Sequence, residues 1–194
     1  YMGFVGKVPW LETPAMDRMA REGAWIRNAF VTTSLSSPSR ASILTGMYSH
    51  SHKVVDNSAP MPAGLTFFPE YLQQVGYQTG FFGKWHMGND TGDPQPGFNH
   101  WESFSGQGEY YNPRLNVNGK WIRYADSTYV TDLLTTHAIE FMKQQQTSHK
   151  PFMVYLSHKG VHDNFSPAKR HKGCYSGKPL VIPPSFETSK EKIK

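Results

Sequence analysis

The stretch from residue 36 to residue 46 carries the residues best suited to chemistry, and it reads Ser-Ser-Pro-Ser-Arg-Ala-Ser-Ile-Leu-Thr-Gly. Arg40 follows Ser36 by four residues, which is about one turn of a helix. Pro38 suits the first helical turn, where no amide donor is needed. We therefore expect Ser36 near a helix N-terminus, where free amides and the helix dipole favour an anion. A serine hydroxyl is a poor nucleophile unless a base or a metal activates it, and Arg40 offers a rigid fork of donors nearby.

Two further blocks place basic side chains directly after predicted strands. Residues 83–88 read Gly-Lys-Trp-His-Met-Gly, and Lys84 and His86 point to one side of an extended chain. Residues 157–162 read Ser-His-Lys-Gly-Val-His and end at His162. Loops at the carboxyl ends of strands are where open α/β sheets place their sites. A surface lysine and a histidine with ordinary partners explain the first block equally well, and an ordinary loop is the favoured explanation of residues 158 and 159.

The elements that must position these residues follow from periodicity and turn signals. Strands alternating with helices predict an α/β sandwich, and the apolar run 151–156 is typical of a buried parallel strand. We expect a hairpin over 110–121 that turns at Asn118-Gly119. The remaining predicted elements are helices over 15–22, 39–44, 68–75 and 129–146 and strands over 24–32 and 79–85.

Composition sets limits on the function. A chain of 194 residues is long enough to bury a core, and no run of 18 apolar residues predicts a membrane span. Cys174 is the single cysteine, which excludes an intrachain disulfide. The net charge of +5 favours an acidic partner such as a sulfated glycan, and no nucleic-acid-binding motif accompanies it.

Taken together and in this order, the three blocks resemble the sulfatase family, with its Ser/Cys-x-Pro-Ser-Arg signature followed by Leu-Thr-Gly. The resemblance implies a sulfuric ester hydrolase with an α/β fold like that of alkaline phosphatase, in which helices flank a largely parallel central sheet. It also implies that a formylglycine-generating maturation enzyme oxidises Ser36 to formylglycine. The hydrate of that aldehyde is then the nucleophile and a ligand of calcium.

The same resemblance implies roles for the other blocks. Arg40 would hold the hydrate, Lys84 would contact the sulfate and the nucleophile, and His86 would orient the hydrate. His162 matches the histidine that touches the sulfate or the leaving oxygen, and an imidazole there stabilises a departing alkoxide. Lys159 is not equated with the family's later catalytic lysine.

Further segments are similar to the N-acetylglucosamine-6-sulfatase and heparan-sulfatase branch of the family: residues 52–57, 110–112, 115–120 and 129–134. This similarity implies a substrate with 6-O-sulfated N-acetylglucosamine in a glycosaminoglycan or mucin-type glycan. The family also implies a periplasmic or secreted protein, and a natural serine at position 36 points to a bacterium. Residues 1–194 resemble the middle portion of the catalytic domain, with the N-terminal metal-binding strand and the C-terminal part outside it.

Other interpretations remain open at this stage. One is a phosphate ester hydrolase of the same superfamily that uses unmodified Ser36 directly. Another is a catalytically silent protein that binds sulfated glycans. His50 and His52 lack a third ligand at zinc-site spacing, and a polar turn explains Asp90 and Asp93 more simply than a calcium site does.

Overall fold

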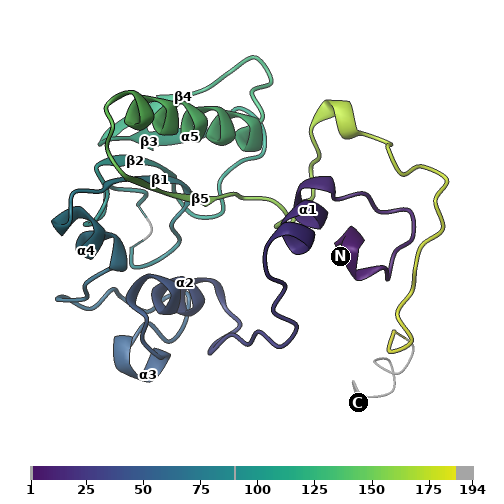
Figure 1. Cartoon of the computed structure of the whole chain (residues 1–194), viewed down its shortest axis with the longest axis horizontal. Helices are drawn as coiled ribbons and strands as arrows, with labels where there is room; N and C mark the ends of the chain where they lie inside the picture. The colour runs from purple at the N-terminus through teal and green to yellow at the C-terminus, as the bar shows by residue number, and fades with distance from the viewer. Residues whose placement is uncertain (1, 90, 187–194) are drawn as a thin grey trace. The chain divides into compact units, whose positions relative to one another are not determined.

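The protein is represented by a computed structural model that describes residues 2–89 and 91–186 (Figure 1). Two compact units make up the chain. One takes in the residues up to 30 together with those from 169 onward, and the other takes in residues 31–168. All three blocks singled out from the sequence lie in the unit of residues 31–168.

A five-stranded sheet with the order β4-β3-β2-β1-β5 forms the centre of that unit. The neighbouring strands β2 (His100–Phe104), β1 (Gln78–Lys84) and β5 (Phe152–Ser157) run parallel. The hairpin strands β3 (Arg114–Val117) and β4 (Lys120–Arg123) run antiparallel and turn at the predicted Asn118-Gly119. The expected α/β fold with a central sheet is confirmed, and this sheet is mixed, with two parallel and two antiparallel strand pairings.

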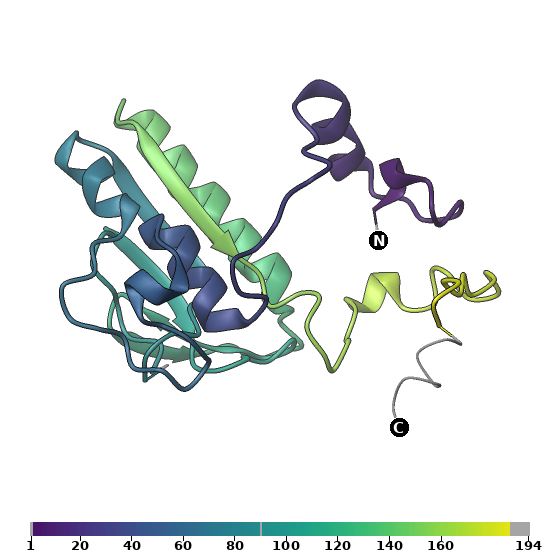
Figure 2. The same ribbon diagram turned by 90° about the horizontal axis from the view of Figure 1, so that it is seen from below.

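Helices cover both faces of this sheet because β1 is apolar on both sides. Phe81 packs with α2 (Ser36–Thr45), through Ala41 and Leu44. Its neighbour Phe82 points to the opposite face and packs against α5 (Val130–Thr147). Figure 1 shows α2 and α5 on opposite sides of the sheet, and Figure 2 shows β5 running alongside α5. The short helices α3 (Ser49–His52) and α4 (Phe68–Gln74) adjoin α2.

The apolar periodicity of α5 explains why this segment is a helix. Val130, Leu134, Ala138 and Phe141 recur at helical spacing, and all four are buried against the sheet. The predicted helix is therefore confirmed within one residue at each end. None of the helices in the described ranges is both long and apolar enough to cross a membrane.

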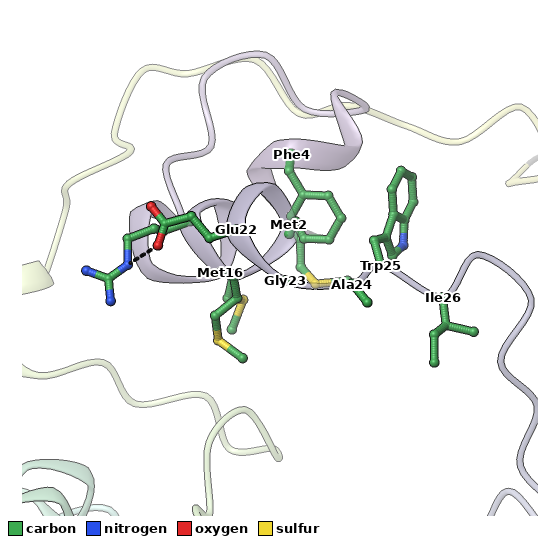
Figure 3. Close-up of a pocket in the computed structure, with 11 residues that line it drawn as sticks. Met2, Phe4, Met16, Glu22, Gly23, Ala24, Trp25 and Ile26 are labelled. Carbon is green, nitrogen blue, oxygen red and sulfur yellow. Dashed lines mark ion pairs between the residues drawn. The ribbon is translucent and has the colours of Figure 1, made fainter.

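The other unit holds α1 (Pro14–Glu22) and two single turns of 3-10 helix, Gly3–Val5 and Lys169–His171. Trp10 packs on Tyr175 and donates its indole N–H to the carbonyl of Pro179 at 3.1 Å. An open apolar cavity of about 680 Å³ lies beside α1 (Figure 3). Methionine and aromatic side chains dominate its lining, namely Met2, Phe4, Met16, Met19 and Trp25.

One strand prediction was wrong, and one strand was missed. Residues 24–32 form no strand, because their alternating apolar side chains find no strand to pair with, and Phe30 remains 91% exposed. Residues 100–104 do form a strand that the sequence did not reveal. The buried carboxylate of Glu102 in its middle conceals the strand pattern, and it is tolerated because His100 and His137 both bind it.

Candidate active site

Three parallel strands end at the same edge of the sheet. Gly83 of β1 aligns with Ser157 of β5 on one side and with Ser103 of β2 on the other. The loops that follow these strands therefore start close together, and they carry His86, Gln107 and His162. This edge is where an open α/β sheet is expected to place its site.

The N-terminus of α2 is bound to this edge. Ser36 is the first residue of the helix, as predicted, and Arg40 lies one turn further on. The next residue, Ser37, donates its hydroxyl to the carbonyl oxygen of His86 at 2.5 Å. The backbone N–H of Ser37 donates to Oδ1 of Asn57 at 3.0 Å. Asn57 therefore satisfies one of the amides that every helix start leaves without an intrahelical partner.

Arg40 connects α2 to two strands. Its Nη1 donates to the carbonyl oxygen of Lys84 at 2.6 Å and to Oγ of Ser157 at 2.7 Å. Ser36, Arg40 and Ser157 also line one open cleft of about 480 Å³. The guanidinium thus places a permanent positive charge in the cleft that Ser36 also lines.

Lys84 and His86 converge on one residue from the loop after β2. The ammonium of Lys84, a residue only 3% exposed, donates to Oε1 of Gln107 at 2.6 Å. Nε2 of His86 lies 3.2 Å from Nε2 of Gln107. The carbonyl oxygen of Gln107 accepts a hydrogen bond from Nζ of Lys159 at 3.0 Å. Two buried lysines and one histidine therefore share Gln107 as a partner.

The electrostatics of this group keep His86 neutral. Burial lowers the pKa of His86 to about 4, and the positive charges of Lys84, Arg40 and His162 act in the same direction. A histidine with this pKa carries no charge at neutral pH. His86 therefore takes part as a neutral hydrogen-bonding group, and its neighbours Arg40 and Lys84 carry positive charge.

His162 lies further out on the same edge. Its Nδ1 is 2.5 Å from a carboxylate oxygen of Asp163, and its side chain is 42% exposed. The carbonyl oxygen of His162 accepts the hydroxyl of Tyr110 at 2.5 Å. His162 does not line the cleft that holds Ser36 and Arg40. Of the five predicted site residues, the structure joins Arg40, Lys84 and His86 through a chain of hydrogen bonds. Ser36 shares a cleft with Arg40, and His162 lies outside that cleft.

Three residues of this edge escaped the sequence analysis: Asn57, Gln107 and Ser157. Gln107 was missed because β2 was missed, and with it the loop that follows a third parallel strand. Ser157 was visible as the residue after the strand predicted over 151–156, which is the signal for a site position in an α/β sheet; in the structure it is the last residue of β5, a partly exposed strand at the end of the sheet order. Asn57 belongs to the segment 52–57 that is similar to the N-acetylglucosamine-6-sulfatase branch, but its contact with the start of α2 has no local sequence signal.

The residues considered for metals have other partners. His52 is buried, and its two ring nitrogens contact Oγ of Ser42 and the backbone N–H of Val54, each at 3.0 Å. A carboxylate oxygen of Asp93 accepts the hydroxyl of Thr91 at 2.5 Å, as in a polar turn, and Asp90 lies outside the described residues. Within residues 2–89 and 91–186, no three His, Cys, Asp or Glu side chains are grouped so that they could hold a metal ion.

Known proteins resemble this chain in sequence and in fold. An N-acetylglucosamine-6-O-sulfatase of Bacteroides thetaiotaomicron is 41% identical over 169 residues, which are 86% of this chain and 29% of that protein. The human N-acetylglucosamine-6-sulfatase is 28% identical over 191 residues, which are 88% of this chain and 34% of that protein. A solved structure of a protein in complex with its substrate D-glucosamine-2-N,6-O-disulfate is 40% identical, with a TM-score of 0.82. The matched region covers 90% of this chain and 35% of the chain in that structure.

The fold is that of the alkaline-phosphatase-like sulfatases. Residues 1–179 match the sulfatase family, and the chain belongs to that family. The family implies a nucleophile derived from a serine or cysteine, together with a metal ion. The chain spans about a third of the length of the relatives described above.

Proposed function

We propose that the protein hydrolyses sulfate esters of a sulfated glycan, and specifically the 6-O-sulfate of N-acetylglucosamine in a glycosaminoglycan or mucin-type glycan. The observation that carries the proposal is the position of Arg40. Its guanidinium links the helix that begins at Ser36 to the ends of β1 and β5, next to Lys84. The similarity to the N-acetylglucosamine-6-O-sulfatase of Bacteroides thetaiotaomicron supports the choice of sugar.

In this proposal each side chain has a defined task. Oxidised to formylglycine and hydrated, Ser36 supplies the hydroxyl that attacks sulfur and takes over the sulfuryl group. The second hydroxyl of the hydrate then loses its proton, and the return to the aldehyde breaks the bond to the sulfated oxygen and expels sulfate. Arg40 and Lys84 bind the sulfuryl oxygens, where negative charge builds up as the bond to the sugar oxygen breaks. His86, neutral because its pKa is about 4, orients the attacking group without adding charge. His162 donates a hydrogen bond or proton to the sugar oxygen, which leaves as an alcohol.

Further parts of the proposal rest on family membership. A formylglycine-generating enzyme would mature Ser36, and the protein would act in the periplasm or outside a bacterial cell. Calcium is the metal that we propose, because it takes oxygen ligands, and Ser36 is the ligand that we assign to it. Since the described residues do not complete such a centre, none of the steps above is assigned to the metal.

Mass spectrometry tests the nucleophile first. Trypsin releases residues 28–40 as one peptide. We expect this peptide to lack two hydrogens at Ser36 and to react with a carbonyl reagent. Sulfate release from 6-O-sulfated N-acetylglucosamine is then measured alongside phosphate release from the matching phosphate ester. An unmodified Ser36 in material from the native organism, together with faster phosphate release, would contradict the proposal.

Arg40→Ala tests the assigned anion binding. Removing one well-placed donor to a developing charge costs on the order of 10²–10³ in turnover, so we expect kcat for sulfate release to fall by that factor. Arg18→Ala is the matched control. Arg18 is an exposed arginine of α1, and its ion pair within the described residues is with the exposed Glu22 at 3.3 Å. Equal activity of the two variants, both folded by circular dichroism, would refute the assignment.

A further inference from the structure

The side-chain amide of Gln107 has only one possible orientation at this edge. An ammonium group has donors and no acceptor, so the atom of Gln107 that meets Nζ of Lys84 at 2.6 Å must be the carbonyl oxygen Oε1. The amide nitrogen Nε2 then faces Nε2 of His86 at 3.2 Å. Exchanging the two amide atoms would set a donor against the donors of Lys84. The lysine therefore determines what Gln107 presents to the histidine.

This orientation determines where His86 carries its proton. An amide NH₂ group only donates, so Nε2 of His86 must accept and cannot itself be protonated. A neutral imidazole with a free Nε2 carries its proton on Nδ1. Burial and the charges of Lys84, Arg40 and His162 lower the pKa of His86 to about 4, which agrees with a neutral ring. The ammonium of Lys84 thus fixes the orientation of the Gln107 amide, and this amide fixes the tautomer of His86.

The backbone of Gln107 is fixed as well. Its carbonyl oxygen accepts Nζ of Lys159 at 3.0 Å, and that ammonium also lies 4.7 Å from the ring centroid of Tyr110. Lys159 is only 6% exposed, so its contacts are sheltered from competing water. The side chain of Gln107 therefore projects from an anchored loop toward Lys84 and His86.

We propose that Gln107 is a positioning residue that holds the ammonium of Lys84 in one direction and keeps the proton of His86 on Nδ1. The proposal rests on the proposed function, since Lys84 and His86 are the groups assigned there to the sulfate and the attacking hydroxyl. Gln107 acts through these two side chains and makes no assigned contact with the substrate.

Two substitutions separate the two tasks of Gln107. Gln107→Glu keeps an oxygen for Lys84 but turns an acceptor toward Nε2 of His86, so the ring must move its proton to Nε2 or take up a second one. Gln107→Met has a similar length and offers neither a donor nor a strong acceptor. Gln144→Glu makes the same chemical change at an exposed position of α5 and serves as the matched control.

The test combines NMR and kinetics on the purified full-length protein. Ring ¹⁵N shifts of His86, assigned by comparison with His86→Gln, should show a proton on Nδ1 in the unsubstituted protein and in Gln144→Glu. In Gln107→Glu they should show a proton on Nε2. In the same variant kcat for sulfate release should fall about 10–100-fold, as is typical when a supporting hydrogen bond to a site residue is removed, with KM changed less than kcat.

The ¹⁵N shifts of His86 test the positioning role of Gln107, and sulfate release tests the proposed function, so the two can fail separately. An unchanged His86 tautomer in both Gln107→Glu and Gln107→Met would overturn the positioning role, even if sulfate release were normal. A shifted tautomer in a protein that releases no sulfate would retain the positioning role and refute the proposed function instead. Should Gln107→Glu fail to fold, Gln107→Met still tests the inference, because it should leave His86 with a mixture of tautomers.

Discussion

The close approach of β1 to β5 at Gly83 makes Gly83→Ala the most informative single substitution. The backbone of Gly83 has φ +115°, a conformation that side chains rarely permit. A Cβ atom built there would lie 1.9 Å from the carbonyl oxygen of Ser157 and 2.7 Å from its carbonyl carbon. Both obstacles are backbone atoms, so no side-chain rotation relieves the clash. The two strands must move apart by about 1 Å.

The expected loss of stability has two parts. A non-glycine residue in such a backbone conformation costs about 1–3 kcal/mol, and forcing extra volume into a packed region costs about 1–3 kcal/mol more. The sum of about 2–6 kcal/mol is a large share of the 5–15 kcal/mol that is typical of a folded domain. We expect the midpoint of denaturant unfolding to fall accordingly.

The expected loss of activity follows from what the two strands hold. Arg40 binds Oγ of Ser157 on β5 and the carbonyl of Lys84, the residue that follows Gly83 on β1. Moving these strands apart displaces the guanidinium from the start of α2. A misplacement of about 1 Å can cost on the order of 10² in rate. Sulfate release by folded Gly83→Ala should therefore be about 10²-fold slower.

Gly119→Ala is a control that separates the effect of the Cβ clash from the effect of the positive φ angle. Gly119, in the turn between β3 and β4, has φ +89°, and a Cβ atom there meets nothing within 4 Å. Gly119→Ala should lose only the conformational part of the stability, about 1–3 kcal/mol, and should keep its activity. If Gly83→Ala matched Gly119→Ala in both unfolding midpoint and turnover, the argument from the β1–β5 contact would be refuted.

The remaining predictions concern the buried carboxylate of β2 and the serine that ends β5. Burial alone would raise the pKa of Glu102, but hydrogen bonds from His100 and His137 outweigh it and hold that pKa below its usual value. The bond to Glu102 raises the pKa of His137. The stability that the Glu102–His137 contact gives to the fold is thus lost at low pH as Glu102 is protonated, and at high pH as His137 loses its proton. His137→Leu should cost about 1.5–3 kcal/mol between about pH 4.5 and 6.5, and less at pH 8.5. A pH-independent difference in unfolding midpoint would contradict this. Ser157→Ala removes one acceptor of Arg40 at 2.7 Å. It should cost about 1 kcal/mol of stability and lower kcat more than it raises KM, as steady-state sulfate release can show.

The amino-acid sequence alone determined the features that depend on residues close together along the chain. The spacing of Ser36 and Arg40 placed both on one helix, because a helix brings residues four apart onto one face. The 3.6-residue recurrence of apolar side chains predicted α5, and the compact apolar runs predicted β1 and β5. These predictions succeeded because the physical cause acts within a few residues of chain.

Only the tertiary structure decided which distant residues meet. Arg40 and Ser157 are 117 residues apart, and Lys84 and Gln107 are 23 apart. Their contacts require β5 and β2 to lie on either side of β1, which the order of strands along the chain does not reveal. Residues 24–32 have a strand pattern and form no strand, whereas β2 contains a buried glutamate and is one. A strand exists only when a neighbouring strand accepts its hydrogen bonds, and a buried carboxylate is tolerated only when partners from other elements satisfy it.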